Sequence, residues 1–491
     1  MTVERMTLAP GLEIARAITG LWQVADLERD GTRVDASAAA VEMARYAAGG
    51  YTTFDLADHY GSAEDLVGEF RTREAEAAHC RFFTKWVPGP GPVTREMVRA
   101  AVDRACSRMR TERIDLLQYH AWSYADPGWI DALFHLAALR REGRIAQLGL
   151  TNFDTAHLRI ALASGIPIVS NQVSCSLLDR RAAGAMSELC LASGVRLLAY
   201  GTVAGGWLSD RWLGAPEPDW ERTGTWSQMK YGRFLRVAGG WDALQRLLAA
   251  LKPIAQRHGV SIANVASRAV LEMPAVAGVI IGARLGASEH RQDNLRLFSF
   301  ALTNRDREEL AAVLATLQPI PGDCGDEYRR PPYLTAAGDL SHHLEHLPPP
   351  FHTEPGAAGR VIALSGTTWE EAAGFARAVR VGDRILVSGT TATHAGHPIG
   401  GSDPTAQTHF AIDKIEGALQ SLGARLEQVV RTRVYVRHME DWEAIARAHG
   451  ERFGAIRPAN TLVRADLVGD EYLVEIEAEA VVGTVLPGTS D

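Results

Sequence analysis

Residues 50–61 read G-Y-T-T-F-D-L-A-D-H-Y-G, and they show the unit from which most of the chain is built. A strand-like apolar run at 51–54 ends at the carboxylate of Asp55, the phenol of Tyr60 follows, and a helix-like amphipathic segment occupies 62–73. Carboxylates at strand ends in α/β proteins tend to lie where the chemistry takes place. The stretch therefore predicts a strand, a functional loop and a helix in that order.

The alternation of strand and helix continues from residue 14 to about residue 300. Eight apolar runs, each followed by a longer segment of helical period, lie at 17–24, 52–57, 81–86, 114–120, 145–150, 168–173, 195–200 and 277–282. Such alternation predicts parallel strands covered by helices, and a closed (β/α)8 TIM barrel needs this number of repeats. A doubly wound sheet would alternate in the same way, but no G-x-G-x-x-G follows any run, so a barrel is favoured.

Reactive or amide-bearing side chains stand at the ends of successive predicted strands. In a barrel the carboxyl ends of the strands meet at one mouth, so these side chains are expected to lie together. In chain order they are Asp55, Lys85, His120, Thr151 with Asn152, Asn171 with Gln172, Tyr200, and Arg284 with Asp293 and Asn294 after the last strand.

Length and charge restrict the class of protein. A chain of 491 residues is expected to form two or three domains. The formal net charge of −8, without a basic stretch, argues against a nucleic-acid partner. No apolar run reaches about eighteen residues, so no membrane partner is predicted. Residues 1–10 lack the apolar centre of a signal peptide, which favours a cytoplasmic protein.

The cysteines show no C-x-x-C spacing. This pattern indicates reduced thiols rather than a disulfide framework or a zinc site, and no metal site is predicted. The five cysteines are Cys80, Cys106, Cys175, Cys190 and Cys324.

Residues 1 to about 320 resemble the aldo-keto reductase family. The resemblance is carried, in order, by F-D-L-A-D-H-Y-G (54–61), F-F-T-K-W (82–86), I-D-L-L-Q-Y-H (114–120), L-G-L-T-N-F (148–153), N-Q-V (171–173) and I-G-A-R (281–284). It implies an enzyme that interconverts a carbonyl, as an aldehyde or ketone, and an alcohol.

The same resemblance assigns four catalytic roles. Tyr60 would be the general acid, although a free tyrosine has a pKa of about 10 and is a poor acid at neutral pH. Lys85 would lower that pKa, Asp55 would pair with Lys85, and His120 would orient and polarise the carbonyl oxygen. Taken singly, Lys85 could be a snorkelling surface lysine and His120 a satisfied core histidine. The four residues together favour the catalytic interpretation.

The amides at the strand ends predict a nicotinamide cofactor. Tyr200 offers a ring face on which nicotinamide can stack. The carboxamide of nicotinamide needs hydrogen-bond donors and acceptors, which are available from Thr151, Asn152 and Gln172.

The phosphate end of the cofactor is implied by the resemblance. Arg284 falls where the family carries a basic residue against the adenosine 2′-phosphate, which implies NADP(H) rather than NAD(H). A forked guanidinium suits a phosphate dianion. Asp293 and Asn294 would contact the adenine. His290 stands where the family often has Gln or Arg, and this departure bears on adenine stacking.

Tryptophans near the strand ends predict an aromatic pocket for the carbonyl substrate. Trp22, Trp86 and Trp122 each lie at or just beyond a predicted strand end. The long segment 201–240 is expected to cover the pocket and adds Trp207, Trp212, Trp220 and Trp226.

The composition changes after a predicted helix at 305–317. We assign residues 1–318 to the barrel, 319–358 to a proline-rich connector and 359–488 to a second domain. The connector contains a histidine group that favours a solvated turn over a metal site, namely His342, His343 and His346.

The second domain resembles the Rid family of small trimeric proteins, which have a chorismate-mutase-like α+β fold. A hairpin is predicted at 377–389, helices at 405–422 and 441–453, and strands at 429–436, 461–466 and 472–482. The resemblance is carried by V-S-G-T-T (387–391), V-V-R-T-R-V-Y-V (429–436), R-P-A-N-T (457–461) and V-E-I-E-A (474–478).

The residues expected at a Rid-like cleft are Asn460 and Glu475. Deaminating members of the family carry an arginine after the Pro-Ala pair, where Asn460 stands here, and an asparagine cannot supply that charge or fork. The resemblance therefore favours small-molecule binding or assembly into a homotrimer through this domain. Two alternatives stay open: an enamine or imine hydrolase in the second domain, and a barrel that binds nucleotide without catalysis.

Overall fold

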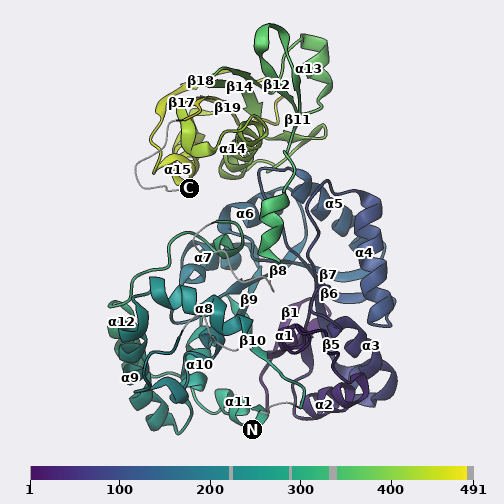
Figure 1. Cartoon of the computed structure of the whole chain (residues 1–491), viewed down its shortest axis with the longest axis vertical. Coiled ribbons are helices and arrows are strands. Elements are labelled where there is room, and N and C mark those ends of the chain that lie inside the picture. The colour runs from purple at the N-terminus through teal and green to yellow at the C-terminus, as the bar shows by residue number, and fades with distance from the viewer. Residues whose placement is uncertain (1, 220–224, 287–289, 331–339, 484–491) are drawn as a thin grey trace.

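The computed structural model describes residues 2–219, 225–286, 290–330 and 340–483. Its larger domain is a closed barrel of eight parallel strands in the order β10-β3-β4-β5-β6-β7-β8-β9, so the predicted (β/α)8 TIM barrel is confirmed (Figure 1). The strands are β3 (Ala17–Gly20), β4 (Thr53–Asp55), β5 (Arg81–Trp86), β6 (Ile114–Tyr119), β7 (Ile145–Thr151), β8 (Ile168–Ser174), β9 (Arg196–Tyr200) and β10 (Val276–Gly282).

Helices cover the outside of the barrel, and polar side chains fix where several of them begin. Asp35, Thr94 and Asp154 each accept a hydrogen bond from a backbone N–H in the first turn of the following helix. The helices of this domain are α1 (Trp22–Leu27), α2 (Ala36–Ala48), α3 (Ala63–Arg73), α4 (Arg95–Arg108), α5 (Gly128–Arg141), α6 (Thr155–Ala163), α7 (Ala185–Ser193), α8 (Trp226–Val237), α9 (Gly240–His258), α10 (Ile262–Leu271), α11 (Arg291–Leu295) and α12 (Asn304–Leu314).

A hairpin that the sequence interpretation missed precedes the barrel. Its strands are β1 (Arg5–Ala9) and β2 (Leu12–Ala15), which pair antiparallel. Leu12 and Ile14 belong to one apolar cluster with Ile18, Phe83 and Leu116 from the barrel strands. The hairpin therefore closes the amino-terminal end of the barrel and leaves the carboxyl-terminal mouth for function.

The second domain is an α+β unit built on a seven-stranded sheet in the order β11-β12-β13-β14-β19-β17-β18. Its own apolar core includes Ile385, Phe453 and Ile476 and lies between this sheet and α14 and α15. Its elements are β11 (His352–Pro355), β12 (Val361–Leu364), α13 (Thr368–Ala373), β13 (Ala378–Val381), β14 (Arg384–Thr391), β15 (Thr393–His394), β16 (His397–Pro398), α14 (Pro404–Ser421), β17 (Val429–Val436), α15 (Trp442–Phe453), β18 (Ala459–Arg464) and β19 (Val474–Val481).

This sheet begins inside the segment that was predicted to be a connector. β11 pairs antiparallel with β12, with His352 opposite Leu364 and Pro355 opposite Val361. Proline-rich composition predicts an extended segment, and an extended segment at a sheet edge can also pair as a strand. The second sheet therefore starts at residue 352 rather than at 359.

No helix in the described ranges combines the length and the apolar character needed to cross a bilayer. The longest, α9, has 19 residues and carries charged side chains at both ends, Asp242 in the first turn and Arg257 in the last. All five cysteines are free and buried.

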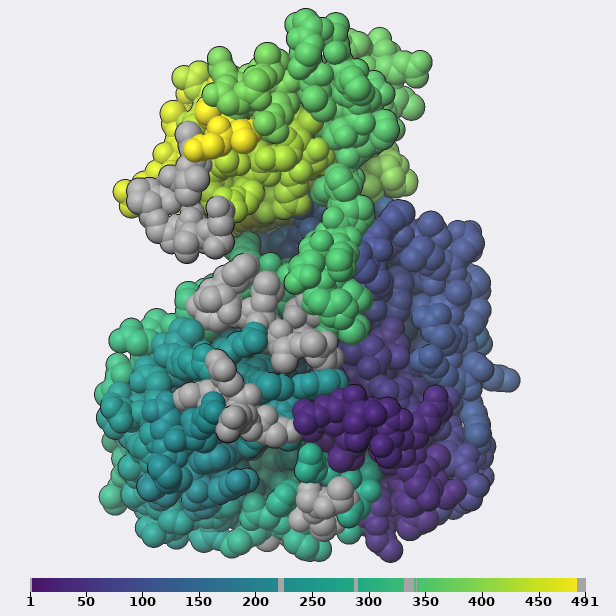
Figure 2. Space-filling view, viewed as in Figure 1, coloured from purple at the N-terminus to yellow at the C-terminus, as the bar shows by residue number. Residues whose placement is uncertain are grey.

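The two domains meet where α14 packs against α6 (Figure 1). Figure 2 shows them as two lobes, with the green connector crossing between them. Phe410 of α14 and Ile399 belong to the main apolar cluster of the barrel. Gly417 lies so close to Ala125 that a Cβ there would be 2.3 Å from the carbonyl oxygen. The contact between the domains therefore has a packed apolar centre.

A buried ion triad adds to this interface. His157 of α6 faces two carboxylates: Nδ1 is 2.6 Å from Oδ1 of Asp154, and Nε2 is 2.9 Å from Oδ2 of Asp413 on α14. Asp413 also accepts a hydrogen bond from Arg452 of α15. Burial alone would lower the pKa of His157, but the two carboxylates raise it above its ordinary value, so the imidazolium is favoured.

We expect His157→Asn to destabilise the chain by about 3 kcal/mol, because it removes the cation that two buried carboxylates share and leaves Asp413 with Arg452 alone. The wild-type contribution is fully present below about pH 6.5, the ordinary pKa of histidine, and is lost as the pH rises through the raised pKa. Urea unfolding from about pH 5 to about pH 9 should therefore show a pH-dependent difference between wild type and variant that shrinks at high pH.

Arg159→Met is the matched control, since it removes the partly exposed ion pair between Arg159 and Asp403 across the same interface. Its cost should stay below about 1 kcal/mol. Equal effects of both substitutions at every pH would show that the buried histidine is not ionised.

Candidate active site

A cavity of about 750 Å³ opens at the carboxyl-terminal mouth of the barrel. It reaches from the ends of the first strands to α11, and aromatic and polar side chains line it together. The predicted site residues in its wall are Trp22, Asp55, Tyr60, Lys85, His120, Trp122, Thr151, Asn152, Gln172, Tyr200, Arg284, Asp293 and Asn294.

Trp86 does not belong to this wall, and its prediction as a pocket residue was wrong. Successive side chains of a strand point to opposite sides. Because Lys85 of β5 points into the cavity, Trp86 points outward and packs on Tyr119, with ring centroids 5.5 Å apart. Among the tryptophans of the segment 201–240, Trp212 and Trp226 line the cavity, Trp207 is buried and packs against Trp212, and Trp220 lies outside the described residues.

The centre of the site is a buried ion pair. Lys85 donates a 2.6 Å hydrogen bond to Oδ2 of Asp55 at the end of β4, and a second of 2.9 Å to the Leu56 carbonyl. The other carboxylate oxygen accepts hydrogen bonds from Gln118 at 3.0 Å and from Gln172 at 2.7 Å. Burial lowers the pKa of Lys85, while the Asp55 carboxylate acts in the opposite direction.

Tyr60 lies directly above this pair. The Lys85 ammonium is 4.8 Å from the centre of the Tyr60 ring, and Trp22 packs edge-on against the same ring at 4.9 Å. The loop that carries Tyr60 is held by Glu28, which accepts hydrogen bonds from the Ser62 backbone and hydroxyl. The Lys85 ammonium therefore lies next to the Tyr60 ring, and Trp22 and the loop contact of Glu28 fix the position of that ring.

His120 follows β6 and is buried. In the part of the chain that the structure describes, neither of its ring nitrogens makes a well-formed hydrogen bond, although the Thr151 backbone lies beside the ring. Its ring lies edge-on to Trp122 at 4.4 Å and to Tyr328 at 5.4 Å. Burial, and then the nearby Arg329 guanidinium, lower the pKa of His120 well below its ordinary value, so the imidazole is neutral. A buried neutral imidazole whose nitrogens lack a well-formed hydrogen bond is suited to a polar atom of a ligand.

The residues predicted for the nicotinamide differ in how they are engaged. Tyr200 donates a 2.7 Å hydrogen bond to Oδ1 of Asn152, whose backbone is in the left-handed region with φ of 59°. The Gln172 amide nitrogen donates to Asp55 and, at 2.9 Å, to Gln118. Gln172 therefore uses its donor to support the ion pair, whereas the Asn152 side chain is held at the cavity wall.

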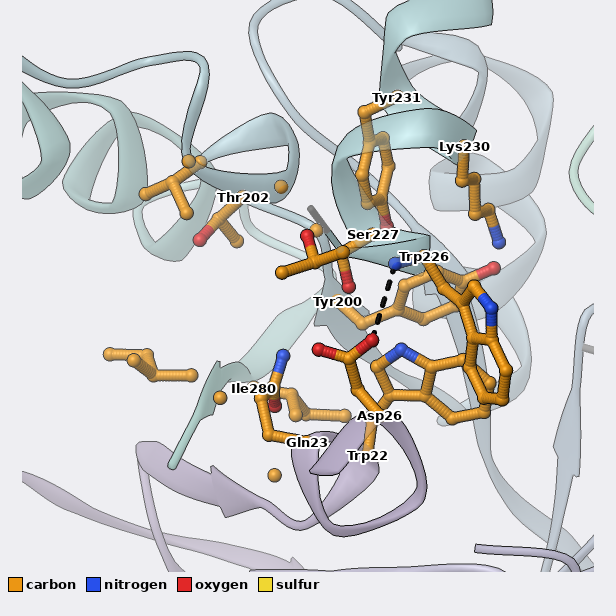
Figure 3. Close-up of a pocket in the computed structure, with 18 of the residues that line it drawn as sticks. Trp22, Gln23, Asp26, Tyr200, Thr202, Trp226, Ser227, Lys230, Tyr231 and Ile280 are labelled. Carbon is orange, nitrogen blue, oxygen red and sulfur yellow. Dashed lines mark hydrogen bonds between the residues drawn. The ribbon is translucent and has the colours of Figure 1, made fainter. Parts of the chain in front are cut away.

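The far end of the cavity carries Arg284. Its guanidinium is 3.4 Å from Asp26, a buried carboxylate of α1. Figure 3 shows Asp26 beneath the start of α8, where the backbone N–H of Trp226 donates to it at 3.4 Å. Asp293 of α11 accepts a 2.8 Å hydrogen bond from Ser261. Asp26 thus contacts both Arg284, which follows β10, and the start of α8.

Four further residues belong to the site that the sequence interpretation did not single out. Gln118 could have been found, since strand alternation places it on the same face as His120. Lys230 of α8, Tyr328 of the connector and Asp26 of the short α1 do not stand at the ends of predicted strands, which is where site residues were sought. The Lys230 ammonium is 4.2 Å from the Tyr328 ring centre and 5.0 Å from that of Tyr200.

In the second domain the two residues predicted for a cleft are not brought together within one chain. Asn460 donates a 3.0 Å hydrogen bond to Thr432, whose hydroxyl also meets His449 of α15, so it faces the helices. Glu475 precedes Ile476, which belongs to the core under the helices, and therefore points to the opposite face of the sheet. A single cleft formed by both side chains of one chain is excluded.

Comparisons with known proteins agree with both domains. Residues 17–315 match the sequence model of the Aldo/keto reductase family, and residues 366–482 match that of Endoribonuclease L-PSP, which corresponds to the Rid resemblance. An uncharacterised protein of Streptomyces coelicolor is 43% identical over 122 residues, which cover 25% of this chain and 91% of that protein.

Two further similarities concern the barrel. Flagellar radial spoke protein 5 of Chlamydomonas reinhardtii is 32% identical over 219 residues, covering 38% of this chain and 41% of that protein, so the chain spans about two fifths of this relative. The structure of the glycerol dehydrogenase from Gluconobacter oxydans superposes with a TM-score of 0.51 at 20% identity over 66% of this chain and 97% of that one, which shows a shared fold. The chain therefore belongs to the aldo/keto reductase family through its barrel, and it carries a second domain of the Rid family.

Proposed function

We propose that this oxidoreductase interconverts a carbonyl, as an aldehyde or ketone, and an alcohol, with NADP(H) as its cofactor. The observation that carries the proposal is the buried Lys85–Asp55 pair beneath Tyr60, opposite the two ring nitrogens of His120. These groups surround one part of the cavity, where a carbonyl oxygen could meet a proton donor and a neutral imidazole together.

The nicotinamide supplies the hydride when the cofactor is bound, and the protein supplies the proton and the positions. Tyr60 gives its phenolic proton to the carbonyl oxygen as that oxygen gains negative charge. Lys85 stabilises the phenolate that remains, and Asp55 balances and holds the ammonium. His120, being neutral, donates an N–H to the same oxygen and fixes the direction of the substrate.

The cavity has donors that fit a dinucleotide along its length. The Asn152 amide lies beside the Tyr200 ring at the end near Tyr60, and both line the wall that a nicotinamide would occupy. Arg284 lies at the other end, and its half-exposed guanidinium can donate hydrogen bonds to a 2′-phosphate. Asp293 and Asn294 lie near it and would contact the adenine.

Tyr60→Phe should lower turnover of a good aldehyde by on the order of 10²–10⁴-fold, because the proton donor is lost. NADPH affinity should remain close to that of the wild type, since other strand ends hold the cofactor. Steady-state kinetics and fluorescence titration measure the two quantities. Tyr435→Phe, on the second domain, is the control and should change neither; a Tyr60 variant with a near-normal rate would refute the assignment.

Arg284→Ala should weaken NADPH by roughly ten- to a hundred-fold and NADH much less, because a charge-assisted contact of about 1.5–3 kcal/mol is lost. Asp26→Asn provides the opposite test: it removes the carboxylate that competes for Arg284, so NADPH should bind more tightly. Fluorescence titration of both cofactors gives the constants. Equal weakening of NADPH and NADH by Arg284→Ala would place this arginine away from the 2′-phosphate.

We further propose that the second domain assembles the chain into a homotrimer. Its helices cover only one face of the sheet, and the opposite face carries half-exposed apolar side chains, Leu386 at 44% and Val463 at 43% of their full exposure. Closed threefold symmetry would bury this face in every copy. Ligand clefts would then lie between copies, which agrees with Asn460 and Glu475 pointing to different faces of one chain.

Light scattering of the full chain should therefore give three times 53.2 kDa. Leu386→Arg should reduce the mass to that of a monomer, because a charge would be buried in the interface. Leu191→Arg, at an equally exposed leucine of α7 on the barrel, is the control and should leave the trimer intact. A barrel made without the second domain, ending near residue 340, should be a monomer that still oxidises NADPH, and a monomeric full-length chain would refute the proposal.

A further inference from the structure

The first part of the connector is built into the mouth of the barrel. Glu327 is buried, accepts a hydrogen bond from Arg181 at 2.8 Å, and has a carboxylate oxygen 3.2 Å from the Tyr200 hydroxyl. Gly325, with φ of 83°, lies so close to Asn152 that a Cβ would be 1.9 Å from the Asn152 carbonyl oxygen. Residues that come after the last barrel helix in the chain therefore touch the side chains and backbone expected to hold the cofactor.

Arg329 makes the most specific of these contacts. Its Nε and Nη2 donate to the carbonyl oxygen of Ala121 at 3.0 and 2.7 Å, and its Nη1 donates to the carbonyl oxygen of Asn152 at 2.6 Å. The guanidinium also lies over the Tyr124 ring at 4.4 Å. The Arg329 guanidinium thus joins Ala121, the residue after His120, to Asn152. It connects the ends of the neighbouring strands β6 and β7.

Asn152 needs such support because its backbone conformation is uncommon. A side chain in the left-handed region is disfavoured, although asparagine tolerates it better than most residues. Here that conformation allows Oδ1 to accept the Tyr200 hydroxyl while the carbonyl oxygen faces the guanidinium. Strained backbone persists where its surroundings hold it in place, and Arg329 is the charged part of those surroundings.

Arg329 also acts on His120 through its charge. The charged and titratable groups that face His120 are Arg329 and Tyr328 from the connector, His59 before α3, and Lys230 of α8, with Tyr60 and Lys85 in the same cavity wall. After burial, Arg329 is the largest influence that lowers the pKa of His120. A second effect of the guanidinium is therefore to add to burial in lowering the pKa of His120.

We propose that Arg329 is a positioning residue of the reductase site, which sets the backbones of Asn152 and His120 from outside the barrel. This proposal rests on the proposed function, in that Asn152 would receive the nicotinamide carboxamide and His120 the carbonyl oxygen. Arg329 touches neither ligand and acts through Ala121 and Asn152. The connector to the Rid domain is accordingly part of the reductase site as well as a spacer.

The experiment compares Arg329→Met and Arg329→Lys in the full chain. Arg329→Met loses the fork and the charge, so NADPH should bind at least about tenfold more weakly and the pKa of His120 should move upward. Arg329→Lys keeps the charge without the fork, so NADPH should again bind weakly while the His120 titration stays near that of the wild type. NMR of the histidine ring, assigned by the signal missing in His120→Gln, follows the titration without turnover.

Arg330→Met is the matched control, because this exposed neighbour makes a 3.6 Å ion pair to Asp326 and lies outside the contacts of Arg329. It should leave both quantities unchanged. If Arg329→Met binds NADPH within twofold of the wild type and leaves the His120 titration unmoved, the proposal is overturned. If Arg329→Met does not fold, Arg329→Lys decides on NADPH affinity alone. If the wild type binds no NADPH, the proposed function fails. The role of Arg329 is then judged by the His120 titration alone, and an unmoved titration in Arg329→Met would refute it.

Discussion

The structure of this protein depends on holding Lys85 and Asp55 together away from water. A buried charge is costly unless it is paired and its remaining hydrogen-bonding atoms are satisfied. Here the carboxylate receives Gln118 and Gln172 as well as Lys85, and the ammonium also donates to a backbone carbonyl. These side chains come from four different strands, β4, β5, β6 and β8. The closed barrel brings these four strand ends to one mouth, so the fold supplies the partners that the buried ion pair requires.

Features that depend on period and position along the chain were predictable from the sequence. Strand–helix alternation identified the barrel, and polar side chains at strand ends identified the central part of the cavity wall, although many of its other lining residues come from the segments 201–231 and 261–267. Where the prediction neglected the period of two within a strand, it failed: Trp86 was placed in the pocket although it comes after inward-facing Lys85, and Gln118 was overlooked although it shares a face with His120. The corrections at Trp86 and Gln118 use information that was already in the sequence. The separation of Asn460 of β18 from Glu475 of β19 also depends on the register between strands, which the period within a strand does not supply.

Other parts of the site could not be predicted, because they depend on contacts between residues far apart in the chain. Tyr328 and Arg329 lie in a proline-rich segment whose composition indicates only an extended connector, and Lys230 lies in α8, within the long segment 201–240 that was predicted only to cover the pocket. Likewise, nothing local marks His157 as the partner of Asp413, which is 256 residues away. Side chains of this kind acquire their role from the docking of one element on another. Local sequence patterns therefore predict the barrel better than they predict the long-range contacts that complete its mouth.

The connector links the cavity of the barrel to the second domain. If Arg329 holds Asn152 in the conformation that a nicotinamide requires, then a bound nicotinamide must by thermodynamic reciprocity favour the docked connector. The same segment leads to a domain that contacts α6 through the ion triad of His157, and α6 is capped by Asp154, two residues after Asn152. Asn152 is thus contacted by Arg329 of the connector, and it also lies just before α6, the helix on which α14 of the second domain packs. An assembly that fixes the second domain would restrain both the connector and α6, and occupancy of the barrel and order at the interface would then be linked through one short stretch of backbone.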